Sequence, residues 1–388
     1  MPEQENPVVS LTQSNWLDER AKLPLLRAFE VKLYSDATIY GEVPALGPYE
    51  LINTIAHARA DLERLRPALV LRINVHGDAA AERMPLIGEP EAEHYHGGDF
   101  ADELAALLSL RLGVRFKAGP IERELFPGQD PRGRPIEFSD KLSPNLSHGR
   151  ATQLPRMRDG VNVVDAVGGL RGFWSLTAGA ANCVIKAARL YQEGVWIADA
   201  DPAMAWLLLV SAVEAAAQHD AFADSSLPTR DVLDHWHAGL GAALATDPSL
   251  GDAVAAKVRK LTAATRKFRS FMQRFGTEVP GVRPLEYERF PPAKVSFKKA
   301  LETVYEHRSN ALHGGIAIPY PMCIPPRING AAIQEIPHGF KISARNATWR
   351  LEDTPMLLNH FEFLARTALT KWWDQLPTVG ANTLGADA

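Results

Sequence analysis

Hydrophobic positions in the first third of the chain follow two different periods. A set of apolar residues after the Gly47-Pro48 pair recurs at helical spacing and predicts a helix: Leu51, Ile52, Ile55, Ala58 and Leu62. Residues 68–75 read ALVLRINV, a β-branched run typical of a strand. Asp99 then precedes an apolar-periodic segment that Gly113 ends, which predicts a second helix, and VRFK at 114–117 predicts a short strand.

This periodicity is lost between Ala118 and Asp159. Gly, Pro, Arg and Ser dominate there, in pieces such as FPGQDPRGRP and KLSPNLSHG, and such a composition is typical of a long connection. We therefore predict a mixed α/β N-terminal domain over residues 1–160, which includes a Pro/Gly-rich connection at about 118–160.

From residue 161 onward the apolar period is helical almost throughout. Asp201 followed by Pro202 has the pattern of an N-cap with proline at the first helical position. The expected helices cover residues 180–198, 202–214, 231–244, 254–275, 294–312 and 354–373, with a Pro-rich, strand-containing insert before the last one. The expected fold class is therefore α+β, with a helical-bundle domain over residues 161–388.

Net charge, cysteine content and the lack of long apolar stretches limit where the protein is expected and what it binds. The 388 residues carry a formal net charge of −4, so no global basic field attracts nucleic acid or an anionic membrane. Cys183 and Cys323 are too few for a disulfide framework or a thiolate metal cage, and we expect both to be reduced core residues. The N-terminus lacks the pattern of a secretory signal, and no apolar stretch reaches the roughly 20 residues of a membrane span. We expect a cytoplasmic protein that does not enter a membrane.

The fifth expected helix carries an arginine on its apolar stripe. Arg308 follows Leu301 and Val304 at helical spacing, and an unpaired buried guanidinium costs several kcal/mol. Arg308 therefore needs a carboxylate partner, or it lines a cleft that an anion enters. His313 comes five residues later, about 140° around an ideal helix, so the two side chains do not share one face. The two groups could reach a common cleft only through the long arginine side chain, through a helix end loosened by the two glycines, or across a second subunit.

An arginine and a histidine suit RNA cleavage without a metal. Histidine can exchange a proton with the 2′-OH or the leaving oxygen near neutral pH, and arginine stabilises the charged phosphorane. Asn310, three residues before His313, is placed to orient the imidazole or to donate to phosphate. The alternative interpretation is structural, because histidine is favoured near a helix C-terminus and glycine is a common C-cap.

Two phrases of the sequence resemble one protein family. Residues 304–315, VYEHRSNALHGG, resemble the Rx4–6H signature of HEPN domains, with Arg308, Asn310 and His313 at the matching positions. Residues 204–214, MAWLLLVSAVE, are similar to the first-helix phrase of Apea-like HEPN proteins. The resemblance covers residues 180–375 and does not extend to the first 160.

This resemblance implies a helical bundle, often dimeric, in which two motifs face each other across a subunit cleft. It implies endoribonuclease activity in a toxin, abortive-infection or antiphage defence system, with Arg308 and His313 catalytic and Asn310 supporting them. No metal or cofactor is expected. Ser309 stands where active members commonly carry Asn, Asp or His. The alternative is therefore a noncatalytic HEPN module that binds RNA, a nucleotide or a protein partner, and the N-terminal domain is a candidate surface for such a partner.

Physical reasoning adds one acidic residue to this site. Glu214 ends the otherwise apolar helix at 202–214, and its carboxylate is a candidate for the partner that Arg308 requires. The alternative is that Glu214 points into solvent at the helix end.

The helix at 254–275 is strongly basic on its polar side. Its basic residues are Lys257, Arg259, Lys260, Arg266, Lys267, Arg269 and Arg274, and no acidic residue lies among them. Several recur at a spacing of seven and line up along the helix, which favours a track for an RNA backbone. The alternative is a solvated face balanced by acids elsewhere.

Two weaker signals are given structural interpretations. The pairs His94 with His96 and His235 with His237 lack an evident third metal ligand, so we interpret them as surface histidines. Asp199 and Asp201 resemble a DxD metal motif, but the position of Asp201 before Pro202 favours a helix cap.

Overall fold

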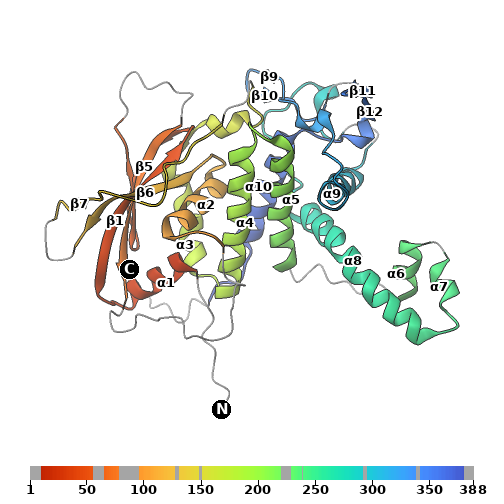
Figure 1. The fold of residues 1–388 in the computed structure, drawn as a ribbon, viewed down its shortest axis with the longest axis horizontal. Helices are drawn as coiled ribbons and strands as arrows, with labels where there is room; N and C mark the ends of the chain where they lie inside the picture. The colour runs from red at the N-terminus through yellow and green to blue at the C-terminus, as the bar shows by residue number, and fades with distance from the viewer. Residues whose placement is uncertain are drawn as a thin grey trace, which may run out of the picture. The chain divides into compact units, whose positions relative to one another are not determined.

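The computed structural model is of mixed α+β class and divides into two compact units. The first unit is Met1–Ala212 with Leu369–Ala388, and the second is Val213–Ala368. The structure describes residues 10–55, 65–77, 96–126, 131–147, 151–219, 229–237, 239–291, 295–337 and 341–379. Figure 1 shows the fold.

A six-stranded antiparallel sheet forms the base of the first unit. Its order is β3 (Val43–Leu46), β4 (Tyr49–Asn53), β5 (Arg66–His76), β1 (Leu25–Ser35), β6 (Lys117–Leu125) and β7 (Arg134–Pro135). Alternate residues of the two long central strands, such as Leu33, Leu69 and Leu71, are fully buried. One face of the sheet is therefore apolar and must be covered.

Helices cover that face in the first unit (Figure 1). They are α1 (Leu11–Arg20), α2 (Phe100–Leu112) and α3 (Val167–Trp174), and α4 (Ala178–Ile197) packs against α2. Helix α2 begins with a capping box at Asp99 and ends at Gly113, which is in the left-handed conformation. Outside this sheet, β2 (Thr38–Tyr40) pairs in parallel with β8 (Gly160–Asn162).

A buried ion cluster ties the segments of the first unit together. Arg115, from the loop between α2 and β6, donates to Asp36 at 2.7 Å and to Asp199 at 3.1 Å, and all three side chains are essentially inaccessible. Its Nε donates to the carbonyl of Val195 in α4 at 2.7 Å. The partly exposed Arg158 also lies against both carboxylates, so the two negative charges are matched.

The second unit is mostly helical. It contains the end of α5 (Pro202–His219), then α6 (Thr229–Trp236), α7 (Leu240–Ala243), α8 (Pro248–Phe275), α9 (Phe297–Gly314) and most of α10 (Leu358–Asp374). Two small hairpins interrupt it, β9 (Ile328–Asn329) with β10 (Ala332–Ile333) and β11 (Lys341–Ala344) with β12 (Ala347–Arg350). In its C-terminal part, α8 buries one side, which includes Phe268, Met272 and Phe275.

Several sequence predictions agree with these elements. The strand at 68–75 is the core of β5, and the helix after Asp99 is α2. All six helices expected after residue 161 are present, although the one at 231–244 is divided between α6 and α7. The expected N-cap is also present, since Asp201 accepts a hydrogen bond from the backbone N–H of Met204 at 3.0 Å.

Two local predictions were wrong. The helix predicted from Leu51 onward is strand β4 at its start, because Leu51 is buried opposite Leu71 of β5; residues 56–64 lie outside the described residues. The short strand predicted at 114–117 begins only at Lys117 and continues to Leu125, inside the segment expected to be a connection. A register irregularity around Pro120 lets this strand pair with β1 in spite of the proline.

The unit boundary differs from the domain boundary expected at residue 160. Helices α3 and α4 and the first part of α5 belong to the first unit, as does the end of α10. The physical reason is packing, because α4 lies against α2 and supplies a carbonyl to Arg115.

The structure also describes the surroundings of the two cysteines and the length of the apolar helices. Cys183 and Cys323 form no disulfide within the described residues, and each is partly accessible rather than fully buried. Burial raises the pKa of the Cys183 thiol to about 12, so the thiol is protonated at neutral pH. Among the helices of the described residues, none is long and apolar enough to cross a membrane.

The buried ion cluster predicts a large loss of stability when its arginine is removed. The Arg115→Met variant would leave Asp36 and Asp199 with only the partly exposed Arg158, so we expect a loss of about 3–5 kcal/mol in the free energy of unfolding. The measurement is urea unfolding followed by tryptophan fluorescence. The control is Arg27→Ala, which removes an exposed arginine of β1 and should cost no more than about 1 kcal/mol. Equal losses in the two variants would contradict the prediction.

Candidate functional site

Helix α9 positions the residues of the candidate site. Ser296 caps its N-terminus by accepting from the backbone N–H of Lys299, and Gly315 ends it in the left-handed conformation at φ 64°. Its buried face includes Ala300, Leu301 and Val304 and packs against α8. Because the helix is regular through Gly314, residues five positions apart point in different directions.

Arg308 is held by an ion pair at the edge of this buried face. Its Nη2 donates to a carboxylate oxygen of Glu214 in α5, and the two side chains are 18% and 12% exposed. The other oxygen of Glu214 accepts the hydroxyl of Tyr305 at 2.7 Å. The guanidinium also lies 5.8 Å from the centre of the Tyr305 ring. Arg308 therefore has the carboxylate partner that its apolar surroundings require.

Tyr305 is the member of this cluster that sequence reasoning missed. Burial raises the pKa of its phenol, and so do the hydrogen bond and the negative charge of Glu214. Its ring lies 5.3 Å from that of Phe268, which connects α9 to α8. The sequence did carry a signal, since Tyr305 lies three residues before Arg308 and therefore on the same side of the helix.

His313 lies apart from this cluster. The side chain is exposed on the last turn of α9, and no hydrogen bond or ion pair links it to another described residue. Asn310 is partly buried, and its backbone carbonyl accepts from Gly315 and Ile316 at the end of the helix. Within one chain, the structure brings Glu214, Tyr305 and Arg308 together and leaves His313 facing solvent.

A second histidine of the same helix has a structural contact. The ring of His307 lies 2.7 Å from the backbone carbonyl of Asp353, in the short helix before α10. This contact links α9 to the chain after the second hairpin, and it gives His307 a role in packing.

The basic residues of α8 divide into paired and unpaired groups. Arg269 donates to Glu302 of α9 at 2.7 Å, so its charge is already offset. Lys257, Arg266 and Lys267 form no ion pair with the described part of the chain. Arg274 is exposed, with its guanidinium 4.7 Å from the centre of the Phe275 ring. The side chains of Arg259 and Lys260 lie outside the described residues.

The histidine pairs and the two aspartates that resemble metal motifs have structural roles where the structure describes them. The ring of His96 lies 2.7 Å from the buried carboxylate of Glu103, so His96 is not a surface histidine. His94 lies outside the described residues, as does the side chain of His235. Asp199 belongs to the buried ion cluster of Arg115, and Asp201 is a helix cap. In the described ranges, no group of three or more acidic, histidine or cysteine side chains is placed to hold a metal ion.

Comparisons with family models, with curated proteins and with solved structures each find no match to this chain. The function must therefore be argued from the residues and their geometry.

The ion pair of Arg308 predicts a measurable coupling. In a double-mutant cycle of Glu214→Ala and Arg308→Ala, we expect a coupling of about 1–3 kcal/mol in the free energy of unfolding, because each single variant leaves a half-buried partner unsatisfied. The matched control is the cycle of Arg269→Ala and Glu302→Ala, a more exposed pair between α8 and α9 that should couple by no more than about 1 kcal/mol. A coupling for Glu214 and Arg308 that does not exceed the control would show that the pair contributes little.

Proposed function

We propose that this protein is a HEPN-type endoribonuclease that cleaves RNA without a metal, and that it acts as a homodimer. In this proposal Arg308 of one chain and His313 of the partner subunit act on the same phosphodiester. The observation that carries it is the position of both residues on α9, one anchored at the edge of the core and the other exposed at the helix end.

Arg308 has the properties of a phosphate-binding residue. The ion pair with Glu214 fixes the direction of the side chain, while its partial exposure leaves guanidinium surface for a second anion. An arginine that is already oriented loses little conformational freedom when it binds, and its planar group matches the geometry of a phosphate.

His313 is suited to act on a group that approaches from outside its own chain. The imidazole is exposed and bears no hydrogen bond to the described residues. Its neighbours Leu312 and Ile316 are apolar and are 49% and 61% exposed. Exposed apolar side chains around a functional group favour burial against another surface, and a second copy of α9 would supply one.

The chemistry follows from these two positions. The neutral imidazole takes the proton of the 2′-OH, whose oxygen then attacks the adjacent phosphorus. The guanidinium stabilises the negative charge that develops on the phosphate oxygens. The bond to the 5′-oxygen breaks and this oxygen takes up a proton from water, which gives a 2′,3′-cyclic phosphate and a 5′-hydroxyl, and the imidazolium returns its proton to solvent. Asn310 would support the imidazole or donate to the phosphate.

The unpaired basic residues of α8 support RNA as the substrate. Lys257, Arg266 and Lys267 give this helix local positive charge that the acidic chain as a whole lacks. Contact between these side chains and phosphates would release counterions and hold the RNA strand along the helix. We also propose a defence or toxin role for the protein, with the N-terminal domain over residues 1–160 as the contact for a protein partner.

Two observations favour a second candidate, a noncatalytic HEPN module that binds RNA. The carboxylate of Glu214 offsets the charge of Arg308, and no described side chain orients the ring of His313. Both features weaken catalysis without affecting binding along α8. The two candidates differ in one measurement, because only the first forms cleaved products.

The nuclease proposal predicts that Arg308→Ala and His313→Ala each lower the rate of RNA cleavage by more than about 100-fold. Cleavage of a labelled RNA by the purified protein should continue in EDTA. The control is His307→Gln, which changes the neighbouring histidine that contacts Asp353 and should keep most of the activity. If wild type cleaves no RNA but binds it, the noncatalytic candidate is correct.

The same variants test the shared site. In an equal mixture of Arg308→Ala and His313→Ala chains, about half of the dimers are mixed and each contains one complete site of two, so about a quarter of the activity should return. No recovery in a mixture that forms mixed dimers would contradict the composite site.

The salt dependence of RNA binding tests the role of α8. The triple variant Lys257→Ala, Arg266→Ala, Lys267→Ala should reduce the slope of log affinity against log salt by about 2, since each phosphate contact on a single strand contributes roughly 0.7. The measurement is fluorescence anisotropy with a labelled single-stranded RNA between low and moderate salt. Arg269→Ala is the control, because its charge is already paired with Glu302. An unchanged slope in the triple variant would place the RNA elsewhere.

A further inference from the structure

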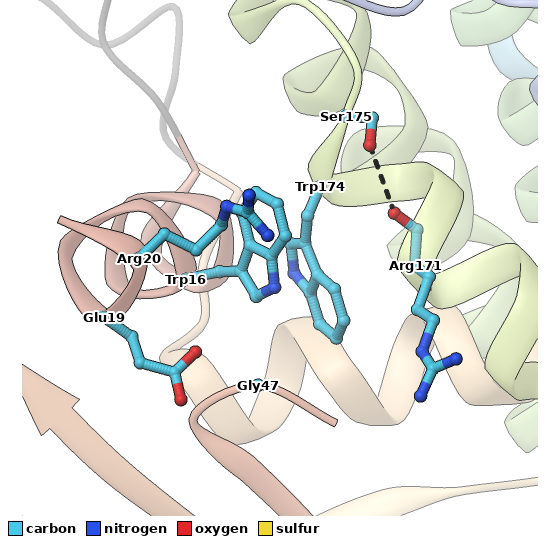
Figure 2. Close-up of a pocket in the computed structure, with 7 residues that line it drawn as sticks. All are labelled: Trp16, Glu19, Arg20, Gly47, Arg171, Trp174 and Ser175. Atoms are coloured by element: carbon cyan, nitrogen blue, oxygen red, sulfur yellow. Dashed lines mark hydrogen bonds between the residues drawn. The ribbon is translucent and has the colours of Figure 1, made fainter. Parts of the chain in front are cut away.

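A pocket in the first unit lies far in sequence from the candidate RNA site. It lies between α1, the turn from β3 to β4 and α3, and its volume is about 470 Å³. Figure 2 shows its lining residues. This volume is within the range of small-molecule sites in proteins.

Two tryptophan rings form the apolar part of the pocket. The rings of Trp16 and Trp174 are nearly parallel, with centroids 5.9 Å apart and planes 15° from each other. The guanidinium of Arg20 also lies against Trp16, at 4.8 Å from the ring centroid. An exposed cation–π contact of this kind contributes about 0.5–1 kcal/mol, so a planar ligand could displace Arg20 at small cost.

Three charged side chains line the same pocket. Glu19 and Arg20 follow Trp16 by three and four residues and lie on the same side of α1, and Arg171 comes from α3. None of the three forms an ion pair with another described residue. In Figure 2 the carboxylate of Glu19 and the guanidinium of Arg171 lie on opposite sides of the tryptophan pair. A ligand with hydrogen-bond donors at one end and an anionic group at the other complements this arrangement.

Two further features concern the polar and steric character of the pocket wall. The indole N–H of Trp174 is buried, lacks a hydrogen-bond acceptor among the described residues and lies on the side of Trp16 in Figure 2. A buried donor without an acceptor is costly, so this N–H is an unused polar group at the pocket wall. Gly47 has φ 62°, and a Cβ there would come within 2.6 Å of the Trp16 ring, so a side chain at this position would collide with the pocket wall.

We propose that this pocket binds a guanine nucleotide, with the base stacked on Trp16 in place of Arg20, the base edge bonded to Glu19 and the phosphate held by Arg171 and the displaced Arg20. Guanine presents two neighbouring donors, N1–H and the 2-amino group, and a carboxylate accepts both. Adenine presents a single amino donor beside an acceptor nitrogen, which repels a carboxylate. Base stacking on an aromatic side chain and an arginine on phosphate are contacts that proteins use repeatedly for nucleotides.

Isothermal titration of the full chain with GMP, AMP, guanosine and inorganic phosphate tests the proposal. GMP should bind at least about tenfold more tightly than each of the other three, because AMP lacks the contact to Glu19, guanosine lacks the phosphate contact and inorganic phosphate lacks both contacts of the base. A tetranucleotide that contains guanine should bind as well as GMP if the natural ligand is RNA, and more weakly if it is a free nucleotide. Absence of GMP binding, or equal affinity for GMP and phosphate, would overturn the proposal.

Variants separate this site from a general effect on folding and from the RNA site. Arg171→Ala should weaken GMP about tenfold, whereas Glu19→Gln should weaken GMP and leave AMP unchanged, which a merely structural role of Glu19 would not produce. Arg27→Ala is the control, since Arg27 lies on β1 with its guanidinium 5.4 Å from the Phe29 ring centroid and does not line the pocket. The chain with Arg308→Ala should bind GMP as wild type does. If this variant does not bind GMP, the nucleotide binds at the candidate RNA site, and the pocket proposal fails while the nuclease proposal stands.

Discussion

The candidate site depends on one constraint, which is that a guanidinium on an apolar helix stripe must meet a carboxylate. Arg308 follows Leu301 and Val304 on α9, and the carboxylate comes from Glu214 of α5. The pair is only partly accessible, so it is neither a solvated surface contact nor a fully dehydrated one. In the proposed function this intermediate position fixes the arginine while it leaves part of the guanidinium open to an anion.

The same constraint shapes the first unit, with a different result. Arg115 is fully buried, and two aspartates and a backbone carbonyl accept its hydrogen bonds, while Arg158 lies against the same two carboxylates. No guanidinium surface is open there to a ligand. The two arginines differ in the accessibility of the guanidinium. We therefore interpret the inaccessible Arg115 as structural and propose a functional role for the partly accessible Arg308.

The sequence predicted local elements better than their assembly. Asp99, Gly113 and Asp201 marked helix ends correctly because caps are local interactions. Strand β4 was missed because Leu51 is buried by pairing with β5, which no local spacing reveals. Within the site, a carboxylate partner for Arg308 could be inferred from the cost of burial, and Glu214 is that partner. The spacing of Tyr305 from Arg308 placed its ring on the same side of the helix, but the hydrogen bond of its hydroxyl to Glu214 depends on the packing of α5 against α9 and could not be inferred.

The remaining gap in the site follows from helix geometry. The regular helix α9 directs Arg308 toward α5 and His313 toward solvent. Because the two side chains leave different faces of the helix, a change of rotamer does not bring them together within one chain. A nuclease built from these two groups therefore requires a second surface, and the exposed Leu312 and Ile316 beside His313 offer one. A binding module has no such requirement, since α8 carries its unpaired basic residues in a single chain. Oligomeric state is thus the physical property on which the choice between catalysis and binding rests: a strictly monomeric protein could hold RNA, but it could not cleave RNA by this pair.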